Sequence, residues 1–295
     1  MIFNFIVNPK SGAGRGKKDI PFLIKQLSEK HQIQYCIYFT EYAGHAEVLA
    51  KELCEKEENI VVAVGGDGTV NEIANAMINK PACMGILPIG SGNGLARHLG
   101  IQMNFSAAFE TLILKNIINI DAIKIGDKIS VNVSGLGFDS QVAFAFKNSV
   151  KRGLKAYTEI ALRELLHYEN GMYEIVYDDN RLVTAAFLVS IANSCQFGNN
   201  VKISPTASVK DGLIDLVVIK PFPVALSLSF IPFVLSGKLN KSPFVEVYQC
   251  KKLQIFHRQK HLHIDGESIE TTYNVIEANI IPNCIQVICN PKYKQ

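Results

Sequence analysis

The sequence lacks the features of several large protein classes. Its seven cysteines are an odd number and include no Cys-x-x-Cys pair, and most of them lie in apolar runs. This pattern argues against a zinc site and suits the reduced cysteines of a cytosolic protein. The net charge is only +3, and the Lys and Arg residues are scattered rather than gathered in a stripe. No nucleic-acid partner is therefore expected, although a mild attraction to anionic lipid is compatible with this charge.

The sequence also lacks segments suited to export or to spanning a membrane. The first residues carry no basic region, and Asn4, Asn8 and Lys10 interrupt the apolar start, so no secretory signal is expected. The longest apolar stretch, residues 221–236, contains three prolines and is shorter than the roughly 20 apolar residues that cross a bilayer. We expect this stretch to be buried, and the alternative is a surface element that touches lipid. These absences predict a cytoplasmic protein.

The composition is that of an ordinary globular protein. Hydrophobic residues make up 48% and charged residues 19% of the chain, and 295 residues are enough for two domains that each have a core. The oligomeric state is not readable from these numbers, and a homodimer is one assembly that they allow.

One stretch, residues 60–72, organises the first half of the chain. Five consecutive aliphatic residues at 60–64 predict a strand buried on both faces, and a helical pattern resumes at Val70. The residues between them include one aspartate, Asp67, and three glycines, namely Gly65, Gly66 and Gly68. Glycines let a backbone approach a ligand closely, and the following helix N-terminus offers N–H groups to an anion such as a phosphate. The alternative is an ordinary strand-to-helix turn that needs glycine for its own geometry.

The same arrangement occurs twice more in the first hundred residues. The apolar run at 2–7 precedes residues 8–16, Asn-Pro-Lys-Ser-Gly-Ala-Gly-Arg-Gly, and the run at 84–87 precedes residues 88–94, Pro-Ile-Gly-Ser-Gly-Asn-Gly. In an open parallel sheet such turns lie at the carboxyl edge, where ligands bind. The three loops are therefore expected to converge on one polyphosphate. None of them has the spacing of a Walker A loop or of the usual dinucleotide fingerprint.

Strand and helix patterns alternate through residues 1–125. This alternation predicts a first domain that is a parallel sheet with helices on both faces. The predicted strands are residues 2–7, 33–39, 60–64, 84–87 and 119–125, and the predicted helices are residues 17–30, 44–57, 70–79, 92–99 and 104–115.

The pattern changes in residues 126–295, where short runs rich in β-forming residues follow one another. They predict a second domain that is mainly an antiparallel β-sandwich, with a barrel as the alternative. One helix is predicted over 140–168 with a break at Gly153, and its basic flank faces either solvent or anionic headgroups. The predicted strands are residues 129–134, 173–177, 183–192, 214–219, 245–248, 252–256, 261–265, 276–281 and 284–288.

Several motifs resemble those of one family, in that family's order and across nearly the whole chain. They are residues 8–12, 65–72, 88–97, 132–139 (Asn-Val-Ser-Gly-Leu-Gly-Phe-Asp), 192–193, 205–215 and 265–267 (Asp-Gly-Glu). In these motifs the chain is similar to the diacylglycerol kinase catalytic-domain family, which includes bacterial lipid kinases and sphingosine kinases. The Gly-Gly-Asp-Gly element alone is less specific, because it resembles one shared with NAD kinases and phosphofructokinases. The resemblance implies an ATP-dependent lipid kinase with a first domain of that shared fold.

The glycine loops and their neighbours supply the groups that phosphoryl transfer needs. The reaction requires the γ-phosphate, a divalent cation and the attacking oxygen to be held in line, with their charge neutralised. Asp67 lies where a carboxylate would hold Mg²⁺ against the phosphates, directly or through water. The resemblance implies that Thr40 lies beside the nucleotide. Its position before a predicted helix, taken alone, is equally compatible with a helix cap. The expected ATP-binding residues are Asn8, Lys10, Ser11, Gly12, Arg15, Thr40, Gly65, Gly66, Gly68, Thr69, Glu72, Gly90, Ser91, Asn93 and Glu267.

Asp265, in the Asp-Gly-Glu motif, is the candidate general base. From the sequence alone, Asp-Gly between apolar runs is first a hairpin turn. The resemblance implies that Asp265 takes the proton of the lipid hydroxyl, and that it projects into the cleft between the domains with Glu267 in support.

A loop of the second domain matches one that carries a structural metal in some bacterial members of the family. The resemblance implies Mg²⁺ on Asp211 and on the backbone of Leu213, whereas Ser208 stands where a second acid is expected. The alternative is a simple turn at Asp211 into the strand at 214–219.

Three functions compete. The first is an ATP- and Mg²⁺-dependent kinase that visits the membrane surface and phosphorylates a lipid hydroxyl of the diacylglycerol or sphingoid-base type. The second is a kinase of a soluble acceptor such as NAD, and the third is a nucleotide- or lipid-binding protein without activity. The presence of Asp67, Asp265 and all three loops favours an enzyme, and the motifs at 8–12 and 88–97 favour a lipid acceptor.

Overall fold

The computed structural model describes residues 1–12, 19–149, 154–223, 236–271 and 274–293. The chain forms two compact units: unit 1 comprises Met1–Asp121 and Asn283–Gln295, and unit 2 comprises Ala122–Pro282. Only the backbone is described at residues 154 and 155. Each unit is described separately below.

Unit 1 is built on a parallel sheet, as the sequence predicts. Its strands β1 (Ile2–Val7), β2 (Gln34–Phe39), β3 (Asn59–Gly65) and β4 (Cys83–Pro88) lie in the order β2-β1-β3-β4. The last part of β18 (Val275–Ile288) adds a further parallel partner for β4. Every residue of β3 and β4 is buried, which explains the unbroken aliphatic run at 60–64.

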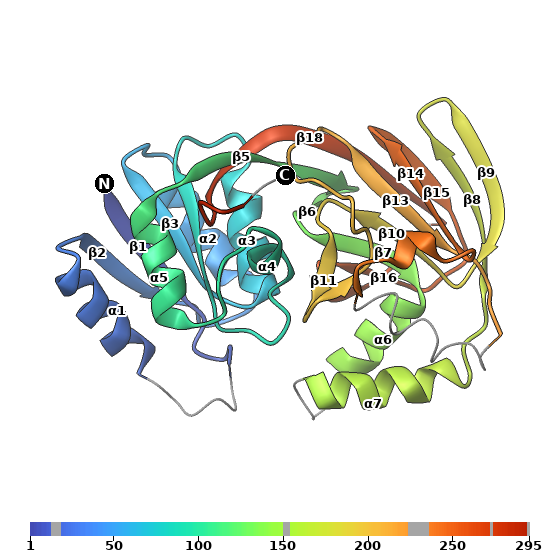
Figure 1. Cartoon of the computed structure of the whole chain (residues 1–295), viewed down its shortest axis with the longest axis horizontal. Helices are drawn as coiled ribbons and strands as arrows, with labels where there is room; N and C mark the ends of the chain where they lie inside the picture. Colours follow the sequence, from blue (N-terminus) through green and yellow to red (C-terminus); the bar gives the residue numbers. More distant parts are fainter. Residues whose placement is uncertain (13–18, 150–153, 224–235, 272–273, 294–295) are drawn as a thin grey trace. The chain divides into compact units, whose positions relative to one another are not determined.

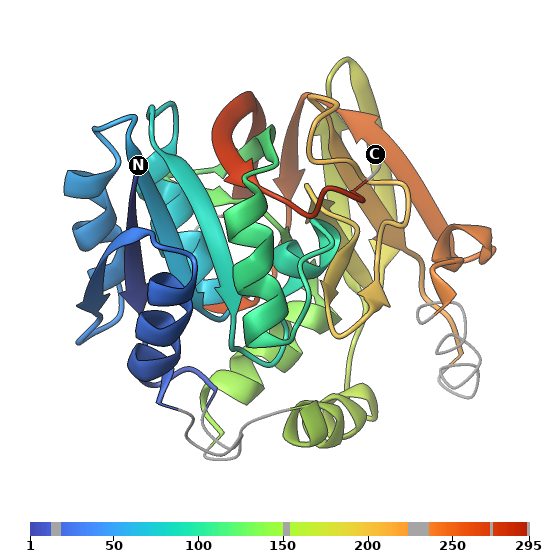
Figure 2. The ribbon, with the colours of Figure 1, turned by 60° about the vertical axis from the view of Figure 1, so that its left-hand side comes forward.

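Helices cover both faces of this sheet (Figure 1). They are α1 (Ile20–Lys30), α2 (His45–Leu53), α3 (Asp67–Met77), α4 (Gly94–His98) and α5 (Phe105–Leu114). Figure 2 shows α1 and α5 on the same face, where the Phe5 ring of β1 stacks on Phe109 of α5 with their centroids 5.8 Å apart. Asp19 and Asn104 cap α1 and α5 by accepting from backbone N–H groups. Helix α3 begins at Asp67 rather than at the predicted Val70, because an acidic residue is favourable in a first turn.

The described residues of unit 2 form two large antiparallel sheets, one short two-stranded sheet and two α-helices. A six-stranded sheet has the order β14 (Val245–Cys250), β13 (Ile214–Ile219), β10 (Leu188–Ala192), β7 (Val133–Gly137), β16 (His261–Ile264) and β17 (Glu267–Glu270). The other sheet is formed by the first part of β18, β15 (Lys252–Phe256), β8 (Gly171–Tyr177), β9 (Asn180–Ala186), β6 (Lys128–Ser130) and the end of β5 (Ile117–Ile125). Unit 2 also contains the short pair β11 (Gln196–Gly198) and β12 (Val201–Lys202) and the 3₁₀ turn η2 (Leu239–Lys241).

The two sheets of unit 2 enclose one apolar core. Ile191 and Leu216 from the six-stranded sheet share this core with Ile175 and Ile255 from the other sheet, and all four are fully buried. The predicted β-sandwich is therefore confirmed. The helices α6 (Phe138–Lys147) and α7 (Leu154–Leu165) stand in place of the single helix predicted over 140–168, and α6 packs on β16 and β17.

Several predicted boundaries differ from the observed ones. The predicted strand 129–134 is two strands, β6 and β7, and the predicted strand 183–192 is β9 and β10, separated at Phe187. Conversely, the predicted strands 276–281 and 284–288 are the single strand β18, which continues through Pro282. The chain also does not divide simply at residue 125, because residues 283–295 belong to unit 1. The cause is the parallel pairing of the end of β18 with β4.

The described residues bear on two predictions: that the cysteines are reduced, and that no segment spans a membrane. All seven cysteines are free thiols, and all but Cys36 are buried. Among the described helices, none has the length and apolar character needed to cross a membrane. Most of the apolar stretch 221–236 lies outside the described residues, as do Gly153 and the basic residues Lys151 and Arg152.

Candidate active site

The three glycine-rich loops of unit 1 meet at the carboxyl ends of β1, β3 and β4. Asn8, directly after β1, donates from Nδ2 to Thr69 Oγ1 over 3.2 Å, and its backbone N–H donates to Val64 O over 3.0 Å. The loop after β4 is tied to the loop after β3, since Ile89 N–H donates to Gly65 O over 2.9 Å. The convergence predicted from the sequence is thus present in the backbone of unit 1.

Glycine is required where these loops touch. A Cβ at Gly90 would lie 2.5 Å from Gly66 Cα, and a Cβ at Gly12 would lie 2.8 Å from Ile89 O. Gly12 also has a φ of +74°, a conformation that side chains other than glycine rarely adopt. The loops therefore form a surface of closely packed backbone, which is what a phosphate-binding cradle needs.

The Asp67 carboxylate links two of the loops. Its Oδ2 accepts from Asn93 N–H over 2.8 Å, and its Oδ1 accepts from Gly94 N–H over 2.7 Å, at the start of α4. Hydrogen bonds to a carboxylate are among the stronger ones in proteins. Asp67 consequently holds the third loop against the N-terminus of α3, a role that sequence reasoning did not foresee beside its predicted role toward Mg²⁺.

The other predicted nucleotide residues of unit 1 are placed as follows. Lys10 N–H donates to Asn8 Oδ1 over 3.0 Å in the first loop, whereas Arg15 lies outside the described residues. Glu72 accepts from Gly44 N–H and Ala46 N–H over 2.8 and 3.0 Å, so it caps the start of α2. Because the N-cap of α2 is Gly44, the alternative in which Thr40 caps this helix is wrong.

Asp265 of unit 2 occupies the tight turn between β16 and β17. Ile264 pairs with Glu267, and the two residues between them have positive φ values, +49° at Asp265 and +90° at Gly266. This is the geometry of a type I′ hairpin turn, so the hairpin interpretation of Asp-Gly is confirmed. Glu267 lies on the exposed end of β17.

The Asp265 side chain turns into unit 2 and is only 4% exposed. Its Oδ1 accepts from Ser130 Oγ over 2.6 Å and from Asn132 N–H over 3.1 Å, and its Oδ2 accepts from Val131 N–H over 2.9 Å. Asp265 is therefore fixed against the segment that joins β6 to β7, which the sequence did not reveal.

Two further polar residues lie close to this turn. Asp139, in the first turn of α6, is 8% exposed, and its Oδ2 lies 3.1 Å from Nε2 of the buried His263. Sequence reasoning assigned no role to either residue, although Asp139 lies in the motif at 132–139. The sequence contains no local pattern that indicates this contact, because 124 positions separate the two residues. The pairing of β7 with β16 brings them together.

The predicted structural metal site has the geometry of a turn. Asp211 Oδ1 accepts from Leu213 N–H over 3.0 Å, and Gly212 has a φ of +69°, directly before β13. Within the described ranges, no three His, Cys, Asp or Glu side chains gather as a metal-binding group. The local geometry therefore matches the turn interpretation, and a metal bound there stays a prediction.

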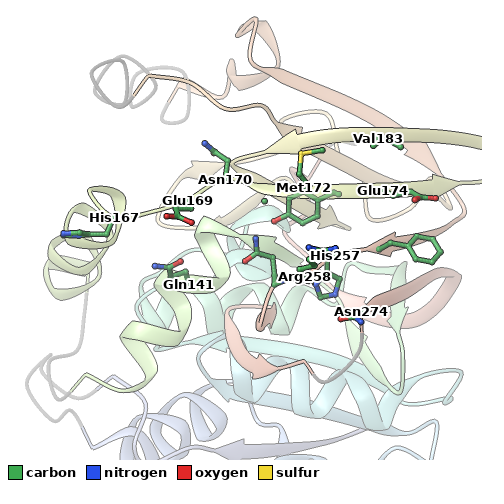
Figure 3. A pocket seen from close by; sticks show the side chains of 14 residues that line it. Gln141, His167, Glu169, Asn170, Met172, Glu174, Val183, His257, Arg258 and Asn274 are labelled. Atoms are coloured by element: carbon green, nitrogen blue, oxygen red, sulfur yellow. Dashed lines mark hydrogen bonds between the residues drawn. The ribbon is translucent and has the colours of Figure 1, made fainter.

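Unit 2 also contains an open hollow of about 970 Å³ beside α6 and β8 (Figure 3). Its lining combines polar and apolar groups in nearly equal parts, with amides such as Gln141 and Asn274, the cation Arg258 and apolar side chains such as Met172 and Val183. None of the predicted site residues lines it.

Comparison with known proteins agrees with this geometry over both units. Residues 3–125 match the diacylglycerol kinase catalytic domain, and residues 132–289 match the YegS C-terminal NAD kinase beta sandwich-like domain. A diacylglycerol kinase from Bacillus subtilis is 28% identical over 271 residues, covering 89% of this chain and 88% of that protein. One from Staphylococcus saprophyticus is 26% identical over 267 residues, covering 89% and 87%.

Solved structures show the same fold. A diacylglycerol kinase from Bacillus anthracis superposes with a TM-score of 0.75 at 21% identity, over 99% of this chain and 98% of that one. An NAD kinase from Archaeoglobus fulgidus, solved in complex with ATP, superposes with a TM-score of 0.54 at 12% identity, over 99% and 95% of the two chains. The fold and the two domain matches thus define a kinase enzyme of the lipid kinase class. The chain belongs to the diacylglycerol kinase catalytic-domain family.

Proposed function

We propose that this protein transfers the γ-phosphate of ATP to the hydroxyl group of a diacylglycerol- or sphingoid-base-type lipid. The observation that carries the proposal is the meeting of three glycine-rich loops in unit 1, two of which the Asp67 carboxylate joins. A surface of closely packed backbone next to a helix N-terminus suits a triphosphate, because side chains do not hold the phosphates away from the N–H groups.

The first turn of α3 supports the placement of the phosphates. Its N-cap residue, Gly66, provides no side-chain cap, so the positive end of this helix is not neutralised by its own N-cap. Asn8 and Thr69, joined by their hydrogen bond, flank this helix end. Lys10, exposed in the first loop, supplies a positive charge near the phosphate oxygens.

A divalent cation completes the charge balance in this proposal. Asp67 would hold Mg²⁺ through water, since its carboxylate also accepts two backbone N–H groups. Magnesium would supply neutralisation of the charge on the phosphates.

Asp265 serves as the general base in this proposal. The hydroxyl oxygen of the lipid forms a bond to the γ-phosphorus, the bond from that phosphorus to the bridging oxygen of ADP breaks, and the hydroxyl proton passes to Asp265. The hydrogen bonds from Ser130 Oγ and two backbone N–H groups keep the carboxylate in one orientation for this transfer. The product is a phosphomonoester lipid, which places the enzyme in phospholipid metabolism.

The acceptor determines where the enzyme acts. A lipid hydroxyl is reached at a membrane surface, so we propose a cytoplasmic enzyme that associates peripherally with the membrane.

The test is transfer from γ-labelled ATP with Mg²⁺ to diacylglycerol, to a sphingoid base and to NAD, each offered separately with the lipids in mixed micelles. We expect label in an organic-phase product from one of the lipids. We also expect Asp265→Asn to lower kcat by about 10²- to 10⁴-fold, the usual contribution of a general base.

The matched control is Asp178→Asn. Asp178 also lies in a hairpin turn and accepts backbone N–H groups, from Lys251 and Lys252, but it is far along the chain from every predicted site residue. This variant is expected to keep wild-type kcat. Label on NAD alone, or a fully active Asp265→Asn enzyme, would refute the acceptor or the base respectively.

A further inference from the structure

The buried residues His263 and Asp139 connect the start of helix α6 to the turn that carries Asp265. His263 is 2% exposed and uses both of its ring nitrogens. Its Nδ1 accepts from Gly266 N–H over 3.3 Å, and its Nε2 lies 3.1 Å from Asp139 Oδ2. Gly266 is the residue directly after Asp265, so the imidazole contacts the turn itself.

The two contacts determine where the imidazole carries its proton. Nδ1 must be unprotonated to accept from Gly266 N–H, so the ring proton of the neutral imidazole is on Nε2 and points to Asp139. The Asp139 carboxylate thereby selects the tautomer that can accept from the turn. The same arrangement of a carboxylate, an imidazole and a third group recurs where a histidine must keep one orientation.

Asp139 is itself fixed by two other elements of unit 2. Its Oδ1 accepts from Ser140 N–H over 2.8 Å in the first turn of α6, and its Oδ2 accepts from Ser190 Oγ of β10 over 3.4 Å. A connected path of hydrogen bonds therefore runs from α6 and β10 through Asp139 and His263 to the turn.

The turn needs such support because its backbone is in a sparsely populated conformation. A non-glycine residue with positive φ, such as Asp265 at +49°, persists where its surroundings favour that conformation. Rotation about the N–Cα bond of Asp265, which changes its φ, would redirect the Asp265 side chain away from Ser130 and Val131 and would carry the N–H of the peptide between Asp265 and Gly266 with it. The imidazole acceptor opposes that rotation by binding the N–H of this peptide.

We propose that His263, held in one tautomer by Asp139, is a positioning residue that fixes the turn peptide and thereby aims the Asp265 carboxylate. This inference rests on the proposed role of Asp265 as the general base. The competing explanation is that His263 only fills space beside Phe197, whose ring centroid lies 5.7 Å away.

The first test uses the wild-type protein and measures no activity. The ¹⁵N shifts of the His263 ring at neutral pH are expected to show a protonated Nε2 and an unprotonated Nδ1, and the Gly266 amide is expected to be protected from hydrogen exchange. A proton on Nδ1, or an unprotected Gly266 amide, would overturn the proposal whether or not Asp265 is the base.

The second test compares two substitutions that each keep one of the two contacts. In His263→Asn, the amide oxygen lies where Nδ1 was and can accept from Gly266 N–H. In His263→Gln, the amide N–H lies where Nε2 was and can donate to Asp139, but the turn loses its acceptor. Both variants lose the imidazole ring, and Asn leaves the larger space, so a role in packing alone would lower the activity of His263→Asn at least as much as that of His263→Gln.

We expect kcat of His263→Gln to fall about 100-fold, the scale produced when a reacting group is displaced by about 1 Å. We expect His263→Asn to keep a kcat at least about 10-fold higher than His263→Gln, with the same KM for ATP in both. Equal kcat values would overturn the positioning role. If either variant does not fold, the ¹⁵N and hydrogen-exchange measurements on the wild type decide.

The parallel Asp265→Asn assay separates the two proposals. If Asp265→Asn is inactive and the two His263 variants are equally active, the base stands and the positioning role fails. If Asp265→Asn is fully active, the base fails, and the ¹⁵N measurement alone then decides whether His263 holds the turn.

Discussion

The two candidate regions, the glycine loops of unit 1 and the Asp265 turn of unit 2, are built from different parts of the chain. In unit 1 a carboxylate, Asp67, joins one stretch of backbone to another, and glycines leave that backbone uncovered. In unit 2 the carboxylate of Asp265 is enclosed by buried side chains and backbone from β6 to β7, and Ser130 and Ser134 are both fully buried.

The two regions differ in which amino-acid substitutions they tolerate. A surface made of backbone depends on the absence of Cβ atoms at a few contacts, so adding a methyl group disturbs it. A site made of buried side chains depends on every polar group having its partner, so removing a partner or adding a charge disturbs it. The following predictions test this contrast.

Among the predictions that test this contrast, the largest effect is expected for Asp67→Asn. The substitution removes the charge from two hydrogen bonds, and bonds to charged groups contribute about 1.5–3 kcal/mol each. We expect the Kd for ATP, measured by calorimetry, to rise about 10- to 100-fold, since about 1.4 kcal/mol corresponds to a factor of ten. Asp127→Asn, at an exposed turn, is the control. Wild-type affinity in Asp67→Asn would show that the third loop does not depend on this carboxylate.

The next effect is a contrast between two glycines that face each other. A Cβ at Gly90 would lie 2.5 Å from Gly66 Cα, whereas a Cβ at Gly66 would lie 3.4 Å from Gly90 Cα. Gly90→Ala is therefore expected to lower the free energy of unfolding by about 1–3 kcal/mol, the cost of overpacking. Gly66→Ala is expected to cost less than about 1 kcal/mol in the same urea titration. Equal losses would contradict the backbone contact between the loops.

A smaller effect is expected for Glu72→Gln. The carboxylate caps α2 through Gly44 N–H and Ala46 N–H, and the amide retains only one acceptor oxygen. We expect a loss of about 1 kcal/mol in the free energy of unfolding, typical of a removed helix cap. A lower ATP affinity with unchanged stability would instead support the nucleotide contact that the family resemblance implies.

The smallest effect concerns a buried histidine of unit 2. Burial lowers the pKa of His257 below its ordinary value of 6.5, and its Nε2 has no hydrogen-bond partner among the residues that the structure describes. As pH falls through 6.5, the unfolded chain binds a proton that the folded chain resists, so stability present above 6.5 is lost toward acid. His257→Asn is expected to flatten the decline of the melting temperature between pH 6.5 and about pH 5.

The control for this measurement is His167→Asn, at a position exposed to solvent. An unchanged pH profile in His257→Asn, or an equal flattening in the control, would show that His257 is protonated as easily in the folded as in the unfolded chain.

Local patterns predicted much of unit 1 and of the sandwich. The aliphatic run at 60–64 and the glycines after it were sufficient to predict β3 and the loop that follows it. Both the burial of a strand and the formation of a turn depend on residues that are adjacent in the sequence. The single strand β18 was predicted as two, because Pro282 ordinarily interrupts a strand, and its two halves pair in different units.

In the candidate site, too, the features that depend on local sequence were predicted and the long-range contacts were not. The glycine loops and the hairpin at Asp265 follow from local residue order. The partners of Asp265 could not be foreseen, since Ser130 lies 135 positions away and is brought there by long-range strand pairing. The pair of Asp139 and His263 needs the same information.

Strand β18 has a consequence for the order in which the protein acquires its structure. Gln286 and Val287 pair with Cys83 and Met84, so β4 lacks one neighbour until more than 280 residues have been synthesised. During synthesis the amino-terminal sheet therefore has an unpaired apolar edge, which is a site where chains associate wrongly. Unit 1 cannot complete its fold first and wait for unit 2, because its final strand follows unit 2 in the chain.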